Sequence, residues 1–173
     1  MGLAFGVVGG MASGEGGGAG APRYACVETA TEAELRVDLG SGEGGAWRGD
    51  LTLTILGGMS ELGGTVFDTS KLGAKAKKPT KVKLKPKEIS DAQRAALFKD
   101  LAAAVNRPEQ GMDCESPVPH SVKLSWSCAN GAFKTGGDVS FEGDRCAGKT
   151  GGYARAVGIT DWAAALLRRH GGR

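Results

Sequence analysis

The clearest pattern in the chain is an alternation of apolar and polar residues, which is typical of half-buried β-strands. It runs without interruption from Ala33 to Leu39 and again over 50–56, where Leu and Ile share one side and Thr shares the other. Gly57-Gly58 and Gly63-Gly64 then bracket a predicted loop before a short strand at 65–68. Because the connections are too short for crossover helices, these strands are expected to form an antiparallel meander.

The same alternation returns in the second half of the chain. Apolar residues at the even positions from Val122 to Cys128 predict another strand. It ends before Asn130-Gly131, a pair that is favoured in tight hairpin turns. A return strand is expected at 132–135, and Gly136-Gly137 is expected to turn the chain once more into a strand at 138–142.

Two helices interrupt the strands. Ser90 is the expected N-cap of the first, and Gln93 three residues later completes a capping box. Arg107 ends this helix because the residue before a proline is pushed out of the helical region. The second helix is predicted to be short, with Thr160 as its N-cap and Gly171 as its stop.

The order of strands, helix, strands and helix predicts a single α+β domain over residues 29–170. We expect a mainly antiparallel sheet, covered on one face by one longer and one short helix and stabilised by disulfides. The length of 173 residues suits one domain, and the 30 glycines leave room for only a small core. No run of 18 apolar residues occurs, so no membrane span is predicted.

Residues 1–25 differ from the rest and are interpreted as a leader or a glycine-rich disordered segment. A weakly apolar stretch runs from Leu3 to Met11, and Ala19-Gly20-Ala21 has the small-x-small form of a signal-peptidase site. No basic residue precedes the apolar stretch, and Pro22 would follow the cut. A degenerate signal peptide and a plain disordered tail therefore both stay open.

The four cysteines, Cys26, Cys114, Cys128 and Cys146, contain no CxxC pair, so the usual zinc or redox spacing is lacking. An even count in a glycine-rich chain with a small core favours two disulfides. Of the three pairings, Cys128–Cys146 with Cys26–Cys114 is the favoured one. The alternative is four reduced thiols in a cytosolic protein, and neither a metal site nor a cofactor is predicted.

The compositional outlier is the segment from Lys71 to Lys87, which holds eight lysines and no acidic residue. Lysines alternate with Val82, Leu84 and Pro86, which predicts a strand with one cationic face. Such a face can attract an acidic protein, a glycan or another polyanion, whereas sequence-specific nucleic-acid binding is not expected without Arg and stacking aromatics. The alternative is an edge strand whose lysines prevent aggregation. The predicted partner-binding residues are Lys75, Lys77, Lys78, Lys81, Lys83, Lys85 and Lys87.

Residues Gly143 to Thr150 match the phosphate-binding pattern G-x-x-x-x-G-K-[ST]. Gly151-Gly152 falls where the helix of such a site should begin, so a glycine-rich surface loop is the favoured interpretation. His120 is expected at the surface at a strand start, and no catalytic residue is predicted.

These patterns indicate a non-enzymatic, exported binding or inhibitor-like module with a lysine-rich contact face, in the periplasm or secreted. The first alternative is a cytosolic polyanion-binding protein with free thiols. The second is a nucleotide-binding enzyme that uses the segment 143–150.

Overall fold

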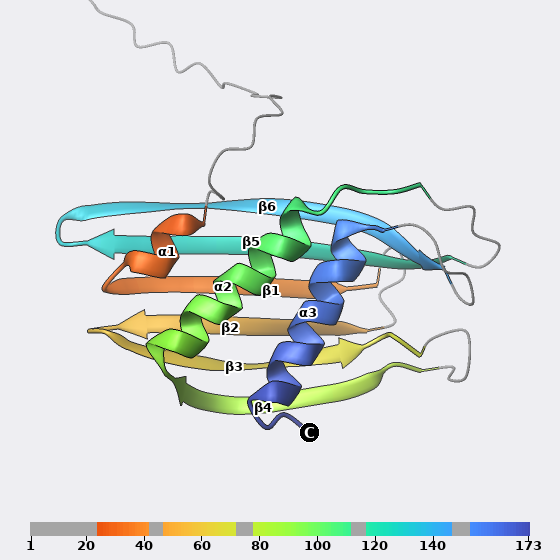
Figure 1. Cartoon of the computed structure of the whole chain (residues 1–173), viewed down its shortest axis with the longest axis horizontal. Helices are drawn as coiled ribbons and strands as arrows, with labels where there is room; N and C mark the ends of the chain where they lie inside the picture. Colours follow the sequence, from red (N-terminus) through yellow and green to blue (C-terminus); the bar gives the residue numbers. More distant parts are fainter. Residues whose placement is uncertain (1–23, 42–46, 72–77, 112–116, 147–152) are drawn as a thin grey trace, which may run out of the picture.

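The computed structural model describes residues 24–41, 47–71, 78–111, 117–146 and 153–173. Six strands form one antiparallel sheet in the order β4-β3-β2-β1-β5-β6 (Figure 1). The strands are β1 Glu32–Gly40, β2 Arg48–Leu56, β3 Met59–Asp68, β4 Thr80–Ile89, β5 Pro117–Asn130 and β6 Phe133–Cys146, and the helices are α1 Ala25–Thr29, α2 Asp91–Asn106 and α3 Arg155–Arg169.

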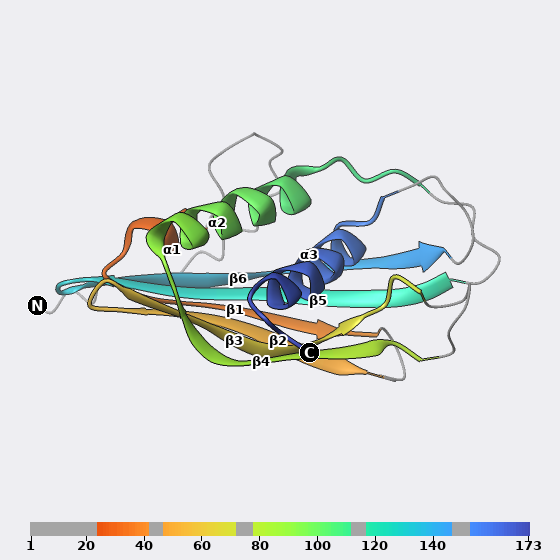
Figure 2. The same cartoon turned by 60° about the horizontal axis from the view of Figure 1, so that its bottom comes forward.

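The α+β class is confirmed, because α2 and α3 lie on one face of this sheet (Figure 2). The strand alternation explains the arrangement: Leu51, Leu53 and Ile55 are buried beneath the helices, and the residues between them face the other side. In the described part of the chain, no helix covers that second face, which we call the open face. None of the described helices is long and apolar enough to cross a membrane.

Two glycine pairs turn out differently from the sequence prediction. Gly57 and Gly58, with φ of 59° and 86°, form the two-residue hairpin turn between β2 and β3, so the predicted loop before residue 65 is wrong. Gly136 and Gly137 do not turn the chain, because β6 is one continuous strand. A Cβ at Gly137 would lie 2.8 Å from Trp126 Cζ2, so this glycine makes room for the indole on the neighbouring strand.

Helix α2 confirms its predicted start, because Ser90 and Gln93 exchange both hydrogen bonds of the capping box. Helix α3 does not follow its prediction. It has 15 residues against 16 in α2 and begins at Arg155, so it is not short. The expected cap, Thr160, is fully buried inside the helix and donates its hydroxyl to the Ala156 carbonyl oxygen at 2.8 Å.

Residues before the expected domain start at Thr29 also pack against the domain, because Tyr24 and Val27 are buried in the core. Helix α1 is tied to β5 by the disulfide Cys26–Cys128, so both favoured pairings, Cys128–Cys146 and Cys26–Cys114, are wrong. Cys128 lies opposite Thr135, and 11 residues of extended strand, about 36 Å, separate Thr135 from Cys146. Cys146 is also disulfide-bonded, whereas Cys114 and the predicted leader up to residue 23 lie outside the described residues.

Candidate functional site

The predicted lysine strand exists as β4, one of the two edges of the sheet. Lys81, Lys83 and Lys85, which we call the lysine row, are exposed and alternate with the buried Val82 and Leu84. They therefore lie on the open face, spaced by about 7 Å along the strand. Lys78 is exposed just before the strand, and Lys75 and Lys77 lie outside the described residues.

Lys87 does not belong to this row, although the sequence placed it there. The β3–β4 register is irregular between Leu62 and Gly64, where Lys85 and Pro86 together face Gly63. Such a bulge suits Pro86, which has no N–H to donate to the ladder, and it reverses the facing of the residues that follow. Lys87 consequently turns toward α3 and donates from Nζ to the His170 carbonyl oxygen at 3.4 Å.

The outer edge of β4 is partly occupied by the chain itself. The Lys83 amide donates to the Arg173 carbonyl oxygen at 2.9 Å, and the Arg173 amide donates to the Lys83 carbonyl oxygen at 3.2 Å. The addition of another strand at β4 is hindered by the bulge, by Pro86, by the lysines and by this pairing with Arg173. What β4 offers to a partner is therefore its side chains rather than its backbone.

The lysine row is not paired with carboxylates in the described part of the chain. None of the ion pairs there involves Lys81, Lys83 or Lys85. Across the sheet, Lys83 lies opposite Thr65 of β3, and Thr65 lies opposite Asp50 of β2. Asp50 is therefore two strands, or about 10 Å, from Lys83. The positive charge of the row is thus available to an anionic partner.

A hollow of about 1040 Å³ lies on the open face, farther from this edge. It is lined by charges of both signs, three cationic and three carboxylate: Arg36, Arg48, Lys123, Asp38, Asp50 and Glu142. Arg36 and Asp38 already pair with each other at 2.8 Å. The charges of the hollow balance, so it has less attraction for a polyanion than the lysine row.

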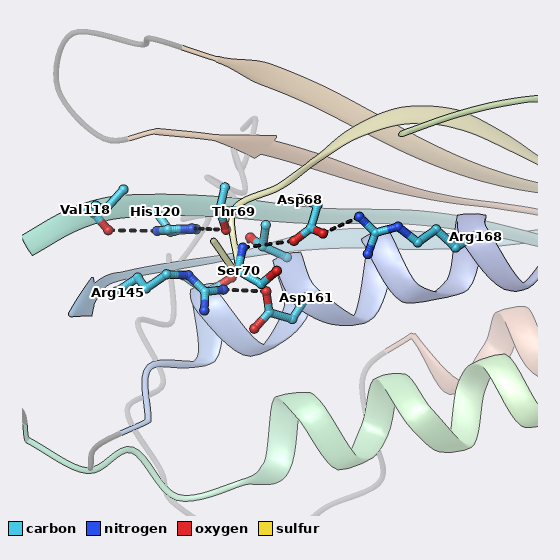
Figure 3. Close-up of polar contacts among 10 residues, drawn as sticks. Asp68, Thr69, Ser70, Val118, His120, Arg145, Asp161 and Arg168 are labelled. Carbon is cyan, nitrogen blue, oxygen red and sulfur yellow. Dashed lines mark hydrogen bonds and ion pairs between the residues drawn. The ribbon is translucent and has the colours of Figure 1, made fainter. Parts of the chain in front are cut away.

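A cluster of polar side chains is buried between the sheet and α3 (Figure 3). His120 is 1% exposed, so the expectation that it lies at the surface is wrong. Its Nε2 lies 2.9 Å from Thr69 Oγ1, and its Nδ1 lies 2.8 Å from the Val118 carbonyl oxygen, to which it donates. Burial lowers the pKa of His120 to about 4. The imidazole is therefore neutral at pH 7.

Asp68 anchors the same cluster to α3. It accepts from the Ser70 amide at 2.9 Å and pairs with Arg168 (Figure 3). Burial opposes the ionisation of Asp68, but the hydrogen bonds from Ser70 and Arg168 outweigh it and lower its pKa to about 2. Asp68 is therefore ionised at neutral pH, and its ion pair joins the end of β3 to α3.

Arg145 of β6 pairs with Asp161 of α3 beside this cluster. Thr69 and His120 have the side-chain types of a nucleophile and a base, but both are buried, at 0% and 1% exposure, and neither lines the hollow on the open face. Sequence reasoning missed the cluster because its members are far apart in the chain. The arrangement holds α3 on the sheet rather than presenting reactive groups to a substrate.

The phosphate-binding match does not have the required backbone in its described half. Gly143 to Cys146 continue β6 and lie opposite Pro117 to His120 of β5, so they form a strand rather than a loop around phosphates. Residues 147–150 lie outside the described part. Among the described residues, no group of three His, Cys, Asp or Glu side chains has the geometry to hold a metal ion. No protein-family model, curated protein or solved structure matches this chain.

Proposed function

We propose that the protein is a non-enzymatic, exported binding module that contacts an anionic partner through the lysine row. The observation that carries the proposal is the row itself, three exposed lysines at regular spacing without a carboxylate in contact. The disulfide Cys26–Cys128 supports export, because disulfides persist in the periplasm and outside the cell. It disfavours the alternative of a cytosolic protein with free thiols.

Binding to heparin and to poly-L-glutamate tests the contact and separates glycan from acidic-peptide chemistry. The variant Lys81→Ser/Lys83→Ser/Lys85→Ser should bind at least tenfold more weakly at low salt, because exposed charge contacts act over about a Debye length. A matched variant, Arg48→Ser/Lys99→Ser/Lys123→Ser, removes the same net charge elsewhere and should stay within twofold of the parent. Equal losses in both variants would show that net charge alone drives binding, and would refute the proposal that the lysine row is the contact surface.

The compartment is tested separately by intact mass on protein from its native source. Alkylation without reduction should leave every cysteine unmodified if the chain is exported and oxidised, and full labelling should appear only after reduction. The same spectrum shows whether residues before Tyr24 have been removed. Cysteines that alkylate freely would overturn the proposal of export, but would not bear on binding through the lysine row.

A further inference from the structure

In the part of the chain that the structure describes, the second edge of the sheet, β6, lacks the proline, the bulge and the backbone pairing that protect β4. It has 14 residues, contains no proline and keeps an unbroken register with β5 from end to end. Outside the ladders, none of the backbone hydrogen bonds among the described residues reaches β6. Over residues 133–145, the outer edge of this long, regular strand has no backbone partner in the described part of the chain, and such an edge is a template for the addition of another strand.

We propose that β6 pairs with β6 of a second copy of this chain, antiparallel and about a twofold axis through Val139. The axis is perpendicular to the sheet, since only this arrangement keeps paired side chains on the same face. The two sheets become one, and the helices of both copies lie on the same side. The proposal is independent of the lysine row, which lies at the opposite edge.

Charge selects the register. With the axis at Val139, Lys134 lies opposite Asp144 of the second copy, and this pair occurs twice. Both side chains are exposed, and neither takes part in an ion pair among the described residues. An axis one residue later would place Asp138 opposite Glu142 twice. An axis one residue earlier would place Lys134 opposite Glu142 twice, but it would also place Asp138 opposite itself at the centre of the ladder. Like charges directly opposed destabilise a ladder.

Apolar contact and length favour the same register. Val139 meets Val139 at the axis, and Phe141 comes to lie opposite Gly137, which is already covered by the Trp126 indole. Both Val139 and Phe141 are only partly buried in the single chain and pack at the margin of the core. The pairing extends over residues 133–145, almost the whole of β6.

The protection of β4 explains why a closed dimer is favoured over a filament. Pairing of β6 with β4 of another copy would be head-to-tail and would continue without end. The bulge at Pro86 and the pairing of Lys83 with Arg173 hinder that contact. Pairing of β6 with β6 of the second copy covers this edge in both copies, so the assembly closes as a dimer.

A charge reversal tests the site and the register together. Lys134→Glu and Asp144→Lys should each weaken the dimer at least tenfold in sedimentation equilibrium, because each places like charges opposite one another twice. The double variant restores both pairs in reverse and should dimerise within about threefold of the parent. A parent that stays monomeric up to millimolar concentration, a filament, or a dimer indifferent to both single changes would overturn the proposal.

Cross-linking gives a second test, which does not depend on weakening the fold. Directly opposed residues of an antiparallel pair have Cα atoms about 4.5–5.5 Å apart, within the range that a disulfide spans. Val139→Cys should therefore yield a covalent dimer under mild oxidation. Glu142→Cys is the matched control: it lies opposite Gly136 of the second copy, and its own counterpart is about 20 Å away, so it should not cross-link. Equal cross-linking of the two variants would contradict the register.

Discussion

The layer between sheet and helices is held together differently at its two ends. At the α1 end, Tyr24 packs against Phe98 and Trp126, each at 6.4 Å between ring centroids, and a disulfide joins α1 to β5. At the opposite end, the buried polar cluster around His120 joins α3 to the sheet (Figure 3). The first end relies on apolar and covalent contacts, which do not titrate, and the second depends on protonation. The two ends should therefore respond to different perturbations.

Removal of the disulfide should have the largest effect. The bond closes a loop across a separation of 102 residues, and a loop of that size is worth roughly 4 kcal/mol in the free energy of unfolding. We expect Cys26→Ala/Cys128→Ala to lose about this amount in urea titrations at pH 7. The loss should be the same at pH 5, because no titrating group is removed. An unchanged urea midpoint would mean that the aromatic contacts suffice at this end.

Acid should weaken the other end next. The pKa of His120 is about 4 in the folded protein and about 6.5 when unfolded, so only the unfolded chain takes up a proton between these values. The stabilisation is complete above pH 6.5 and is lost as the pH falls toward 4, by about 3 kcal/mol. Urea titrations across this range measure the slope, and His120→Gln should flatten it. A slope that persists in His120→Gln would assign it to other groups.

The Asp68 ion pair should contribute somewhat less and in a lower pH window. Its pKa is lowered to about 2, so its stabilisation is present above the usual carboxyl pKa and is lost as the pH falls from about 4 to 2. Asp68→Asn should cost about 2 kcal/mol at pH 7. Asp38→Asn is a suitable control, because its partner Arg36 and the ion pair are exposed and worth little. Equal costs for the two variants would argue against a special role for Asp68.

The smallest change is a gain at the α1 end. The Tyr24 hydroxyl is buried without a hydrogen-bond partner among the described residues, and burial, with a contribution from Glu28, raises its pKa to about 12. An unpaired buried hydroxyl costs free energy, so Tyr24→Phe should raise the free energy of unfolding by up to about 1 kcal/mol. Tyr153→Phe provides the contrast, because the Tyr153 hydroxyl donates to the Ala104 carbonyl oxygen at 2.6 Å and its loss should destabilise. A loss in Tyr24→Phe would point to an unseen partner.

Local patterns in the sequence predicted the local structure well. The alternation placed β1, β2, β4 and β5, and Ser90 with Gln93 placed the start of α2, because both signals depend on residues a few positions apart. The glycine pairs were ambiguous for a physical reason. Gly57 and Gly58 adopt the positive φ angles that the turn requires. Gly137 instead leaves space for the Trp126 side chain of the neighbouring strand. The sequence alone does not distinguish these two uses.

The errors concern contacts between distant residues. The sequence predicted that α3 begins after Thr160, whereas the helix begins at Arg155 and includes Gly158, where a Cβ would lie 2.0 Å from the Tyr153 hydroxyl oxygen. The disulfide pairing and the burial of His120 depend on which strands are neighbours, which no local spacing reveals. Of the candidate site, the lysine row was predictable, whereas the turn of Lys87 toward α3 follows from a bulge opposite Gly63.

The long separation of Cys26 and Cys128 also determines when their disulfide can form during synthesis of the chain. At about 5–20 residues per second, Cys26 waits roughly 5–20 s for the 102 residues that lead to its partner. Cys114 emerges before Cys128, so a competing thiol is available first. Rapid oxidation during synthesis would favour the earlier, non-native bond. The yield of correctly paired protein should therefore depend on thiol–disulfide exchange after synthesis, and so on the presence of an isomerase, more than on the strength of the oxidant.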